Sequence, residues 1–263
     1  MPYPILSPSS PYPQYAGGHA LSVMAKAPRA GKVKTRLSPP LTLAQTAALN
    51  VCFLKDTAEN IAGVGAHSHG LICYTPVGDE QAFENLLPED FALIPQRGDT
   101  FGERLLAAAQ DILACGFVSV SLIDSDSPTV PHAAFAQAVE ELSKPGDRIV
   151  LGPSDDGGYY LIGLKRPHPQ PFDRITWSTG SVAEQTRQRC REASLHLVDL
   201  PLWYDVDDAA TLATLNAELL QSLPPAFAST PGYPAPHTRE FLLELDTPAD
   251  LVAQTPVERS HDR

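Results

Sequence analysis

Residues 117–128 read FVSVSLIDSDSP. The first seven carry β-branched, aromatic and small side chains without a charge, which is typical of a strand buried on both faces. The strand pattern stops abruptly at Asp124, and Asp126 follows two residues later. In α/β proteins, ligands bind beyond the carboxyl ends of the parallel strands. This stretch therefore indicates an α/β fold and the end of the sheet at which a site is expected.

Short apolar runs alternate with longer amphipathic runs outward from this strand. Strands are predicted at residues 19–27, 70–74, 91–95, 117–123, 148–151, 159–164 and 196–200. Helices are predicted at residues 42–61 with Thr42 as N-cap, 79–87, 99–115 with Asp99 as cap, from 131, 182–193 and 207–220. This alternation predicts a mostly parallel central sheet with helices on both faces. We expect one α/β domain at residues 19–222, after a flexible tail at 1–18 and before a partly ordered, proline-rich appendage at 223–263.

The bulk composition excludes several classes of partner. The 263 residues carry a formal net charge of -12, with 31 acidic and 19 basic side chains. An acidic surface repels a phosphate polymer, so no nucleic-acid partner is expected. No apolar run reaches the roughly 18 residues of a membrane helix, and the first 15 residues lack a signal-peptide pattern. The four cysteines form no C-x-x-C pair, and buried reduced thiols fit the reducing cytoplasm. We therefore expect a cytoplasmic protein, and the lack of a long apolar run predicts no membrane contact.

A basic loop follows the first predicted strand. Residues 24–37, MAKAPRAGKVKTRL, hold five of the 19 Lys and Arg residues, and Gly31 lies at the expected bend. Glycine lets backbone N–H groups face an anion, and Lys and Arg neutralise phosphate charge. The loop therefore predicts a phosphate site, although a solvated basic loop is the alternative. The residues expected to bind nucleotide are Lys26, Arg29, Gly31, Lys32, Lys34 and Arg36.

Three acidic motifs accompany this loop. Asp124 and Asp126 are either turn formers or ligands of Mg²⁺ or Mn²⁺, which take one or two carboxylates together with substrate phosphates. In residues 203–210, WYDVDDAA, a carboxylate completes the same metal site or caps the following helix. The candidates there are Asp205 and Asp207.

The third motif is LGPSDDGGYYLIGL at residues 151–164. Asp155 and Asp156 are the candidate catalytic residues, because a carboxylate can take the proton of an acceptor hydroxyl. Gly157, Gly158 and Tyr159 are expected at the substrate, since glycine permits close approach of a ligand. A tight turn without catalytic function is the alternative.

Taken in order, the motifs resemble a bacterial family of glycosyltransferase A (GT-A) proteins that is often found beside radical-SAM enzymes. This family is related to 2-phospho-lactate guanylyltransferase and to the molybdenum-cofactor guanylyltransferase. The resemblance covers about residues 20–220. It is carried by APRAGKVKTRL, QRGDTFGERL, LIDSDSPTVP, LGPSDDGGYYLIGL, ITWSTGSV and WYDVDDAATL.

The resemblance implies a nucleotide-diphospho-sugar transferase fold. It implies that residues 32–36, with Arg104 of QRGDTFGERL, hold nucleotide phosphates. It also implies that Asp126 is the primary metal ligand and that Asp205 or Asp207 is the second. The family commonly has a small residue at the position of Asp124, so Asp126 is the stronger candidate for a metal ligand.

Three functions remain open from the sequence. The first is metal-dependent glycosyl transfer from a nucleotide-diphospho-sugar donor to a small-molecule acceptor. The second is nucleotidyl transfer from a nucleoside triphosphate with release of pyrophosphate, and the third is a non-catalytic nucleotide-binding module. The family label favours the first, while the base, the sugar, the acceptor and the oligomeric state stay open.

Overall fold

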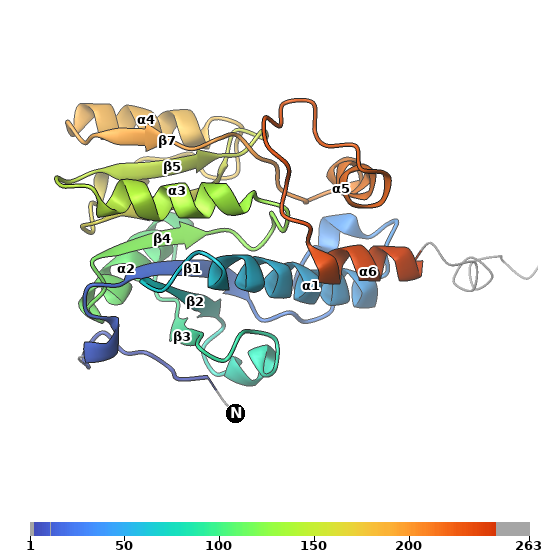
Figure 1. Cartoon of the computed structure of the whole chain (residues 1–263), viewed down its shortest axis with the longest axis horizontal. Coiled ribbons are helices and arrows are strands. Elements are labelled where there is room, and N and C mark those ends of the chain that lie inside the picture. Colours follow the sequence, from blue (N-terminus) through green and yellow to red (C-terminus); the bar gives the residue numbers. More distant parts are fainter. Residues whose placement is uncertain (1–2, 11, 246–263) are drawn as a thin grey trace, which may run out of the picture.

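The computed structural model describes residues 3–10 and 12–245. Seven strands form one sheet in the order β3-β2-β1-β4-β6-β5-β7 (Figure 1). The strands are β1 His19–Lys26, β2 Ser68–Thr75, β3 Ala92–Pro95, β4 Ser119–Ile123, β5 Ile149–Pro153, β6 Tyr159–Leu164 and β7 Leu197–Asp199. Strand β6 is antiparallel to its neighbours β4 and β5, and the other pairings are parallel. The mostly parallel sheet predicted from the sequence is confirmed.

Helices cover both faces of the sheet, as predicted. The α-helices are α1 Leu43–Ala62, α2 Phe101–Ala114, α3 His132–Ser143, α4 Val182–Glu192, α5 Ala209–Gln221 and α6 Pro236–Leu245. Helices α1 and α3 bury apolar residues in one cluster with the sheet, and α2 and α4 bury theirs in the cluster on the opposite face. Within the described ranges, no helix combines the length and the apolarity needed to span a bilayer.

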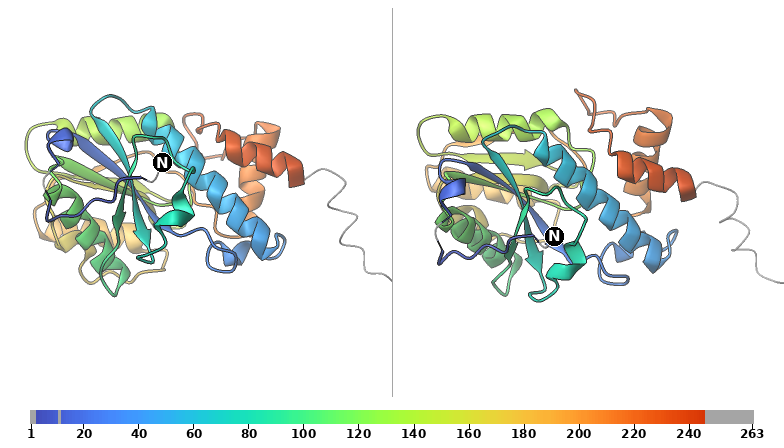
Figure 2. Two further views of the ribbon diagram at one scale, coloured as in Figure 1. Left: turned by 90° about the horizontal axis from the view of Figure 1, so that it is seen from below. Right: turned by 60° about the horizontal axis from the view of Figure 1, so that its bottom comes forward.

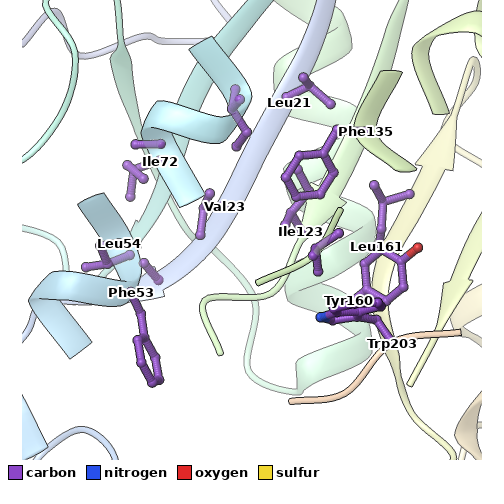
Figure 3. Close-up of a cluster of buried hydrophobic side chains, with 14 of the residues drawn as sticks. Leu21, Val23, Phe53, Leu54, Ile72, Ile123, Phe135, Tyr160, Leu161 and Trp203 are labelled. Carbon is purple, nitrogen blue, oxygen red and sulfur yellow. The ribbon is translucent and has the colours of Figure 1, made fainter. Parts of the chain in front are cut away.

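The side chains of β1 alternate between these two clusters. Leu21 and Val23 lie in the cluster under α1 and α3, whereas Ala20 lies in the other. Figure 3 shows part of the first cluster, with Phe135 of α3 near Leu21. A strand that is buried on both faces needs mostly apolar or small residues on both sides, which explains the run HALSVMA at residues 19–25.

Capping explains where two of the helices begin. The side chain of Thr42 accepts a hydrogen bond from the backbone N–H of Gln45, and the Gln45 side chain accepts one from the backbone of Thr42. The predicted cap at Thr42 is thus confirmed. Helix α2 has the same reciprocal arrangement at Thr100, one residue beyond the predicted cap at Asp99, because Glu103 has the right spacing from Thr100. The helix predicted at residues 79–87 is a 3₁₀ turn over Glu80–Phe83.

The N-terminal segment packs against the domain, so the expectation of a flexible tail was wrong for its described residues. Ile5 bridges Leu93 of β3, and the Leu6 side chain is only 2% exposed. The ring of Tyr15 stacks on Phe117 with 4.7 Å between centroids. Proline and serine dominate the composition of this segment, which is why the sequence suggested a flexible tail. The few apolar residues that become buried did not stand out from that composition.

The C-terminal part of the chain returns to the domain through α6. Both views in Figure 2 show α6 beside α1. Buried Asp56 of α1 accepts hydrogen bonds from the backbone N–H groups of His237 and Thr238, at 3.0 and 2.8 Å. These N–H groups lie in the first turn of α6 and have no partner within the helix. Residues 246–263 of the expected appendage lie outside the described residues.

The core position of Leu21 leads to a stability prediction. Leu21 is 0% exposed, so the Leu21→Ala protein should lose about 2–5 kcal/mol of unfolding free energy through lost burial and a residual cavity. Urea denaturation followed by circular dichroism measures this loss. The matched control is Leu223→Ala at a position 58% exposed, which should change stability by less than about 0.5 kcal/mol. Equal losses in the two proteins would contradict the assignment of the core.

Candidate active site

Two adjoining cavities lie beyond the carboxyl ends of the parallel strands. Their volumes are about 360 Å³ and 670 Å³. They share seven lining residues: Met24, Lys26, Arg36, Phe101, Asp124, Asp126 and Asp207. Five of these have ionisable side chains: Lys26 ends β1, and the other four come from the loops after β1, β4 and β7. The sequence prediction that strand ends carry the site therefore agrees with the location of the cleft.

The first cavity lies over β1 and β2. Lys26 at the end of β1 and Thr75 at the end of β2 line it, together with Gln96 directly after β3. Its cationic lining residues are Lys26, Lys32, Lys34, Arg36 and Arg104. In an acidic protein, this concentration of positive charge makes the first cavity suitable for a phosphorylated ligand.

The side chain of Lys34 is buried, whereas the other four Lys and Arg residues of the basic loop are exposed. Its side chain is 4% exposed, and its Nζ lies 2.8 Å from Asp126 Oδ1 and 2.9 Å from Asp207 Oδ1. It also donates a hydrogen bond to the backbone oxygen of Val206 at 2.7 Å. Burial alone would lower the pKa of Lys34, but the two carboxylates outweigh it and raise that pKa above its ordinary value. The ammonium therefore stays charged and links the loops after β1, β4 and β7.

Asp205 and Asp207 differ in their electrostatic environment, although one residue separates them. Burial would raise the pKa of Asp207, but Lys34 and Arg36 outweigh it and lower that pKa. For Asp205, burial and then the neighbouring carboxylates of Asp156 and Asp207 raise the pKa to about 7, against the weaker opposing effect of Lys34. The region around Asp205 thus holds more negative charge than its cations neutralise.

Asp124 and Asp126 form a turn at the end of β4. The Asp124 carboxylate accepts hydrogen bonds from the Ser127 hydroxyl at 2.8 Å and from the backbone N–H of Asp126 at 3.3 Å. Burial and then the charge of Asp126 raise the pKa of Asp124 well above its usual range. The Asp124 carboxylate therefore stabilises the turn through these two hydrogen bonds, whereas the Asp126 carboxylate contacts Lys34.

The turn between β5 and β6 brings Asp156 to the second cavity, together with Gly158 and Tyr159. The Asp156 side chain accepts a hydrogen bond from the backbone N–H of Gly158 at 2.7 Å. Gly157 has a φ of +89°, and a Cβ at this position would lie 2.1 Å from the backbone oxygen of Gly180. Gly157 is thus required by the close approach of the 178–180 loop, which the sequence did not reveal.

Four predicted site residues line neither cavity. Arg29 forms an ion pair with Asp79, and Gly31, Asp155 and Gly157 are also absent from the lining of both cavities. Among the two candidate catalytic carboxylates, the turn therefore brings only Asp156 to the cleft.

The cleft also contains residues that the sequence analysis did not single out. Asn50, Thr75 and Gln96 line the first cavity, Trp177 lines the second, and Phe101 lines both. The sequences QRGDTFGERL and ITWSTGSV contain three of them, Gln96, Phe101 and Trp177. The sequence signal for Phe101 and Trp177 was an aromatic residue among polar loop residues. Whether such a side chain points into the cleft depends on the fold, which the sequence pattern does not show.

One compact group of metal-ligand side chains lies elsewhere. Within the described part of the chain, Asp56, Glu59 and His237 are the three His, Cys, Asp or Glu residues whose ligand atoms lie within 4.8 Å of one another. Asp56 already accepts two backbone hydrogen bonds from α6, and Glu59 lies 2.7 Å from His237 Nε2. These contacts join α1 to α6 and account for the grouping.

Comparison with known proteins identifies a family match and relatives with this fold. Residues 62–179 match the family described as "uncharacterized protein conserved in bacteria (DUF2064)". The structure of a proposed nucleotide-diphospho-sugar transferase from Desulfovibrio desulfuricans G20 has 30% sequence identity and a TM-score of 0.73, covering 90% of this chain and 98% of that one. No protein with a curated description matches the sequence.

Two further structures share the fold at low identity. CMP:2-keto-3-deoxy-manno-octonic acid synthetase in complex with CTP has 12% identity and a TM-score of 0.52, covering 79% of this chain and 100% of that one. The 4-diphosphocytidyl-2C-methyl-D-erythritol synthase of Anaerococcus prevotii DSM 20548 has 10% identity and a TM-score of 0.51, covering 78% and 96%. At these identities the similarity establishes the fold alone.

The raised pKa of Asp205 leads to a prediction about pH. Its pKa is about 7 in the folded protein against an ordinary 3.8, so between these values the folded protein keeps a proton that the unfolded chain releases. Stability from this group is therefore present at low pH and is lost as pH rises through about 7. Asparagine cannot ionise, so Asp205→Asn should gain about 1–2 kcal/mol relative to wild type between about pH 5 and pH 8, after allowing for solvent screening.

Thermal denaturation of both proteins in EDTA across this pH range measures the difference. A gap between the two melting temperatures that does not change with pH would contradict the raised pKa.

Proposed function

Because the chain belongs to the nucleotide-diphospho-sugar transferase family, we propose that it transfers a glycosyl group from a nucleotide-diphospho-sugar to a small-molecule acceptor with a divalent metal ion. That it is a nucleotide-utilising transferase follows from the structural comparisons. The observation that carries the finer proposal is the pair of cavities, one lined by cations and the other by carboxylates, which share Asp126 and Asp207.

The donor nucleotide occupies the first cavity in this proposal. Lys26, Lys32, Arg36 and Arg104 line it and can neutralise a diphosphate. A charge-assisted hydrogen bond contributes on the order of 1.5–3 kcal/mol. Two such contacts would supply about 3–6 kcal/mol, which corresponds to a Kd between about 6 mM and 40 μM.

Mg²⁺ or Mn²⁺ fits the carboxylates between the two cavities. Asp126 and Asp207 already contact a cation, the Lys34 ammonium, and Asp205 lies beside them, where burial and then the carboxylates of Asp156 and Asp207 raise its pKa. Oxygen ligands of this kind suit magnesium, which is bound by one or two carboxylates and by substrate phosphates. Asp126, with Asp205 or Asp207, would hold the ion, which supplies charge neutralisation for the departing diphosphate.

Asp156 is the proposed base. It lines the second cavity, where the acceptor would lie next to the donor sugar. The acceptor oxygen forms a bond to the anomeric carbon, and the bond from that carbon to the diphosphate oxygen breaks with its electron pair. The acceptor proton goes to the Asp156 carboxylate, which leaves a nucleoside diphosphate and a glycosylated acceptor. Such proton transfer typically contributes about 10²- to 10⁴-fold in rate.

Nucleotidyl transfer is the alternative. The number of cations around the first cavity would also suit the greater charge of a nucleoside triphosphate. The two reactions differ in their products, since glycosyl transfer releases a nucleoside diphosphate and nucleotidyl transfer releases pyrophosphate. Chromatography of the reaction products distinguishes them.

The three aspartates lead to a prediction of separable roles. Thermal shifts with ADP, GDP, CDP and UDP, each with MgCl₂ or MnCl₂, identify the nucleotide that stabilises the wild type. Asp126→Asn should lose the metal-dependent part of this shift, because it removes a ligand charge. Asp156→Asn should keep the shift and lower turnover by at least about 100-fold.

Asp155→Asn is the matched control, because it makes the same charge change outside the cavities. It should keep both the shift and the turnover. If Asp156→Asn removed nucleotide binding as fully as Asp126→Asn, Asp156 would belong with the metal ligands and not with the acceptor.

A pair of arginines tests the phosphate site. Arg36 lines both cavities, whereas Arg29 of the same loop pairs with Asp79 and lines neither. Arg36→Gln should weaken binding of the stabilising nucleoside diphosphate roughly tenfold or more, since it removes a charge-assisted bond. Arg29→Gln should leave it within about twofold, by isothermal titration calorimetry. Equal effects of the two changes would show that the loop acts only through its net charge.

A further inference from the structure

The two cavities differ in charge where they do not overlap. Lys32, Lys34 and Arg104 line only the first cavity, whereas Asp156 and Asp205 line only the second. Among the described residues that line the second cavity alone, none is Lys, Arg or His. Lys26 and Arg36 line both cavities, and Arg36 is paired with Asp207. In the part of the second cavity that the first does not share, an anion would therefore meet Asp156 and Asp205 without a cation beside it.

The second cavity also has an aromatic wall, formed by Phe101, Tyr159 and Trp177. Phe101 begins α2 and is 49% exposed, so part of its ring is accessible from the cavity. Its ring lies edge-on to Trp177 at 4.9 Å between centroids, and Tyr159 lies edge-on to Trp177 at 6.4 Å. Three separate segments thus bring aromatic surface to one side of the cavity.

These two features restrict the ligand by elementary electrostatics. A phosphate group carries about 1.5 to 2 negative charges at pH 7, and beside Asp156 and Asp205 it would be repelled in a partly desolvated site. Hydroxyl groups instead donate hydrogen bonds to carboxylates, while the C–H surface of a carbon skeleton packs on aromatic rings. Ser154, Ser178 and Thr179 in the lining can both donate and accept, which suits hydroxyls better than an organic cation, since a cation only donates.

We propose that the second cavity binds an uncharged, polyhydroxylated acceptor without a phosphate group, its carbon skeleton against Phe101 and Trp177 and its hydroxyls toward Asp156 and Asp205. The role of this ligand as an acceptor rests on the proposed function, whereas its charge and shape follow from the cavity. The donor phosphates and the acceptor are thereby separated by charge within one cleft.

Trp177 supplies a direct readout of this cavity. The protein has two tryptophans, and the other, Trp203, is 1% exposed. We would titrate the wild-type protein with paired probes and follow tryptophan fluorescence: glycerol and glycerol 3-phosphate, glucose and glucose 6-phosphate, myo-inositol and its 1-phosphate. In at least one pair, the neutral member should bind roughly tenfold more tightly than its phosphate. The Trp177→Phe protein should lose the response and still fold.

Two results would overturn the proposal. One is tighter binding of the phosphorylated member in every pair that responds. The other is the absence of any Trp177 response to the neutral probes up to about 100 mM, where even a millimolar site would be filled.

Calorimetry with a variant of the aromatic wall completes the test. Trp177→Ala should weaken the responding neutral probe roughly tenfold and leave nucleoside diphosphate binding with MgCl₂ unchanged, because Trp177 does not line the first cavity. Phe227→Ala, at a partly exposed aromatic outside both cavities, is the control. Nucleotide binding without selectivity for neutral probes would defeat this inference alone. Selectivity for neutral probes without nucleotide binding would instead defeat the proposed function.

Discussion

The geometry of the cleft depends on the buried ammonium of Lys34. It bonds to Asp126, Asp207 and the backbone oxygen of Val206, so one cation ties together the loops that follow β1, β4 and β7. A backbone hydrogen bond from Val206 to Asp126 reinforces the link. All three donors of an ammonium are thereby used, as a buried charge requires. Removing Lys34 would leave two carboxylates facing each other without compensation, and such losses commonly cost about 3–5 kcal/mol.

The same contact organises charge across the cleft. Asp207 is neutralised by Lys34 and Arg36 on the side of the first cavity, whereas Asp205 on the side of the second cavity retains a raised pKa. Two carboxylates separated by one residue thus have opposite electrostatic environments, because Lys34 and Arg36 contact Asp207, whereas burial and the carboxylates of Asp156 and Asp207 dominate at Asp205. The boundary between a cationic and an acidic cavity follows from where these cations are placed.

The sheet and the location of the cleft were predictable, because apolar runs report strands and ligands bind at strand ends. The individual roles within the basic loop were not. Lys34 and Arg36 lie two positions apart in the same loop and carry the same charge. Only the fold decides that the Lys34 side chain is buried and the Arg36 side chain is exposed. The turn at residues 155–158 presents a similar ambiguity, since two adjacent aspartates point in different directions. Trp177 escaped attention because its partner Phe101 is 76 positions away, and a sequence pattern does not encode such contacts.

The contact between Gly157 and Gly180 has a consequence for how the enzyme can diversify. It joins two backbones, and the oxygen of Gly157 also accepts a hydrogen bond from the N–H of Ala183 in α4. Neither interaction involves the side chains at 178 and 179, which line the second cavity. Substitutions at those two positions would therefore change the lining of the second cavity and leave this backbone contact in place, provided that the loop keeps its shape, which the Thr179 hydroxyl supports by a hydrogen bond to the Thr176 oxygen at 2.7 Å. In the function proposed above, mutation and selection would thereby change acceptor preference while Asp156 keeps its place.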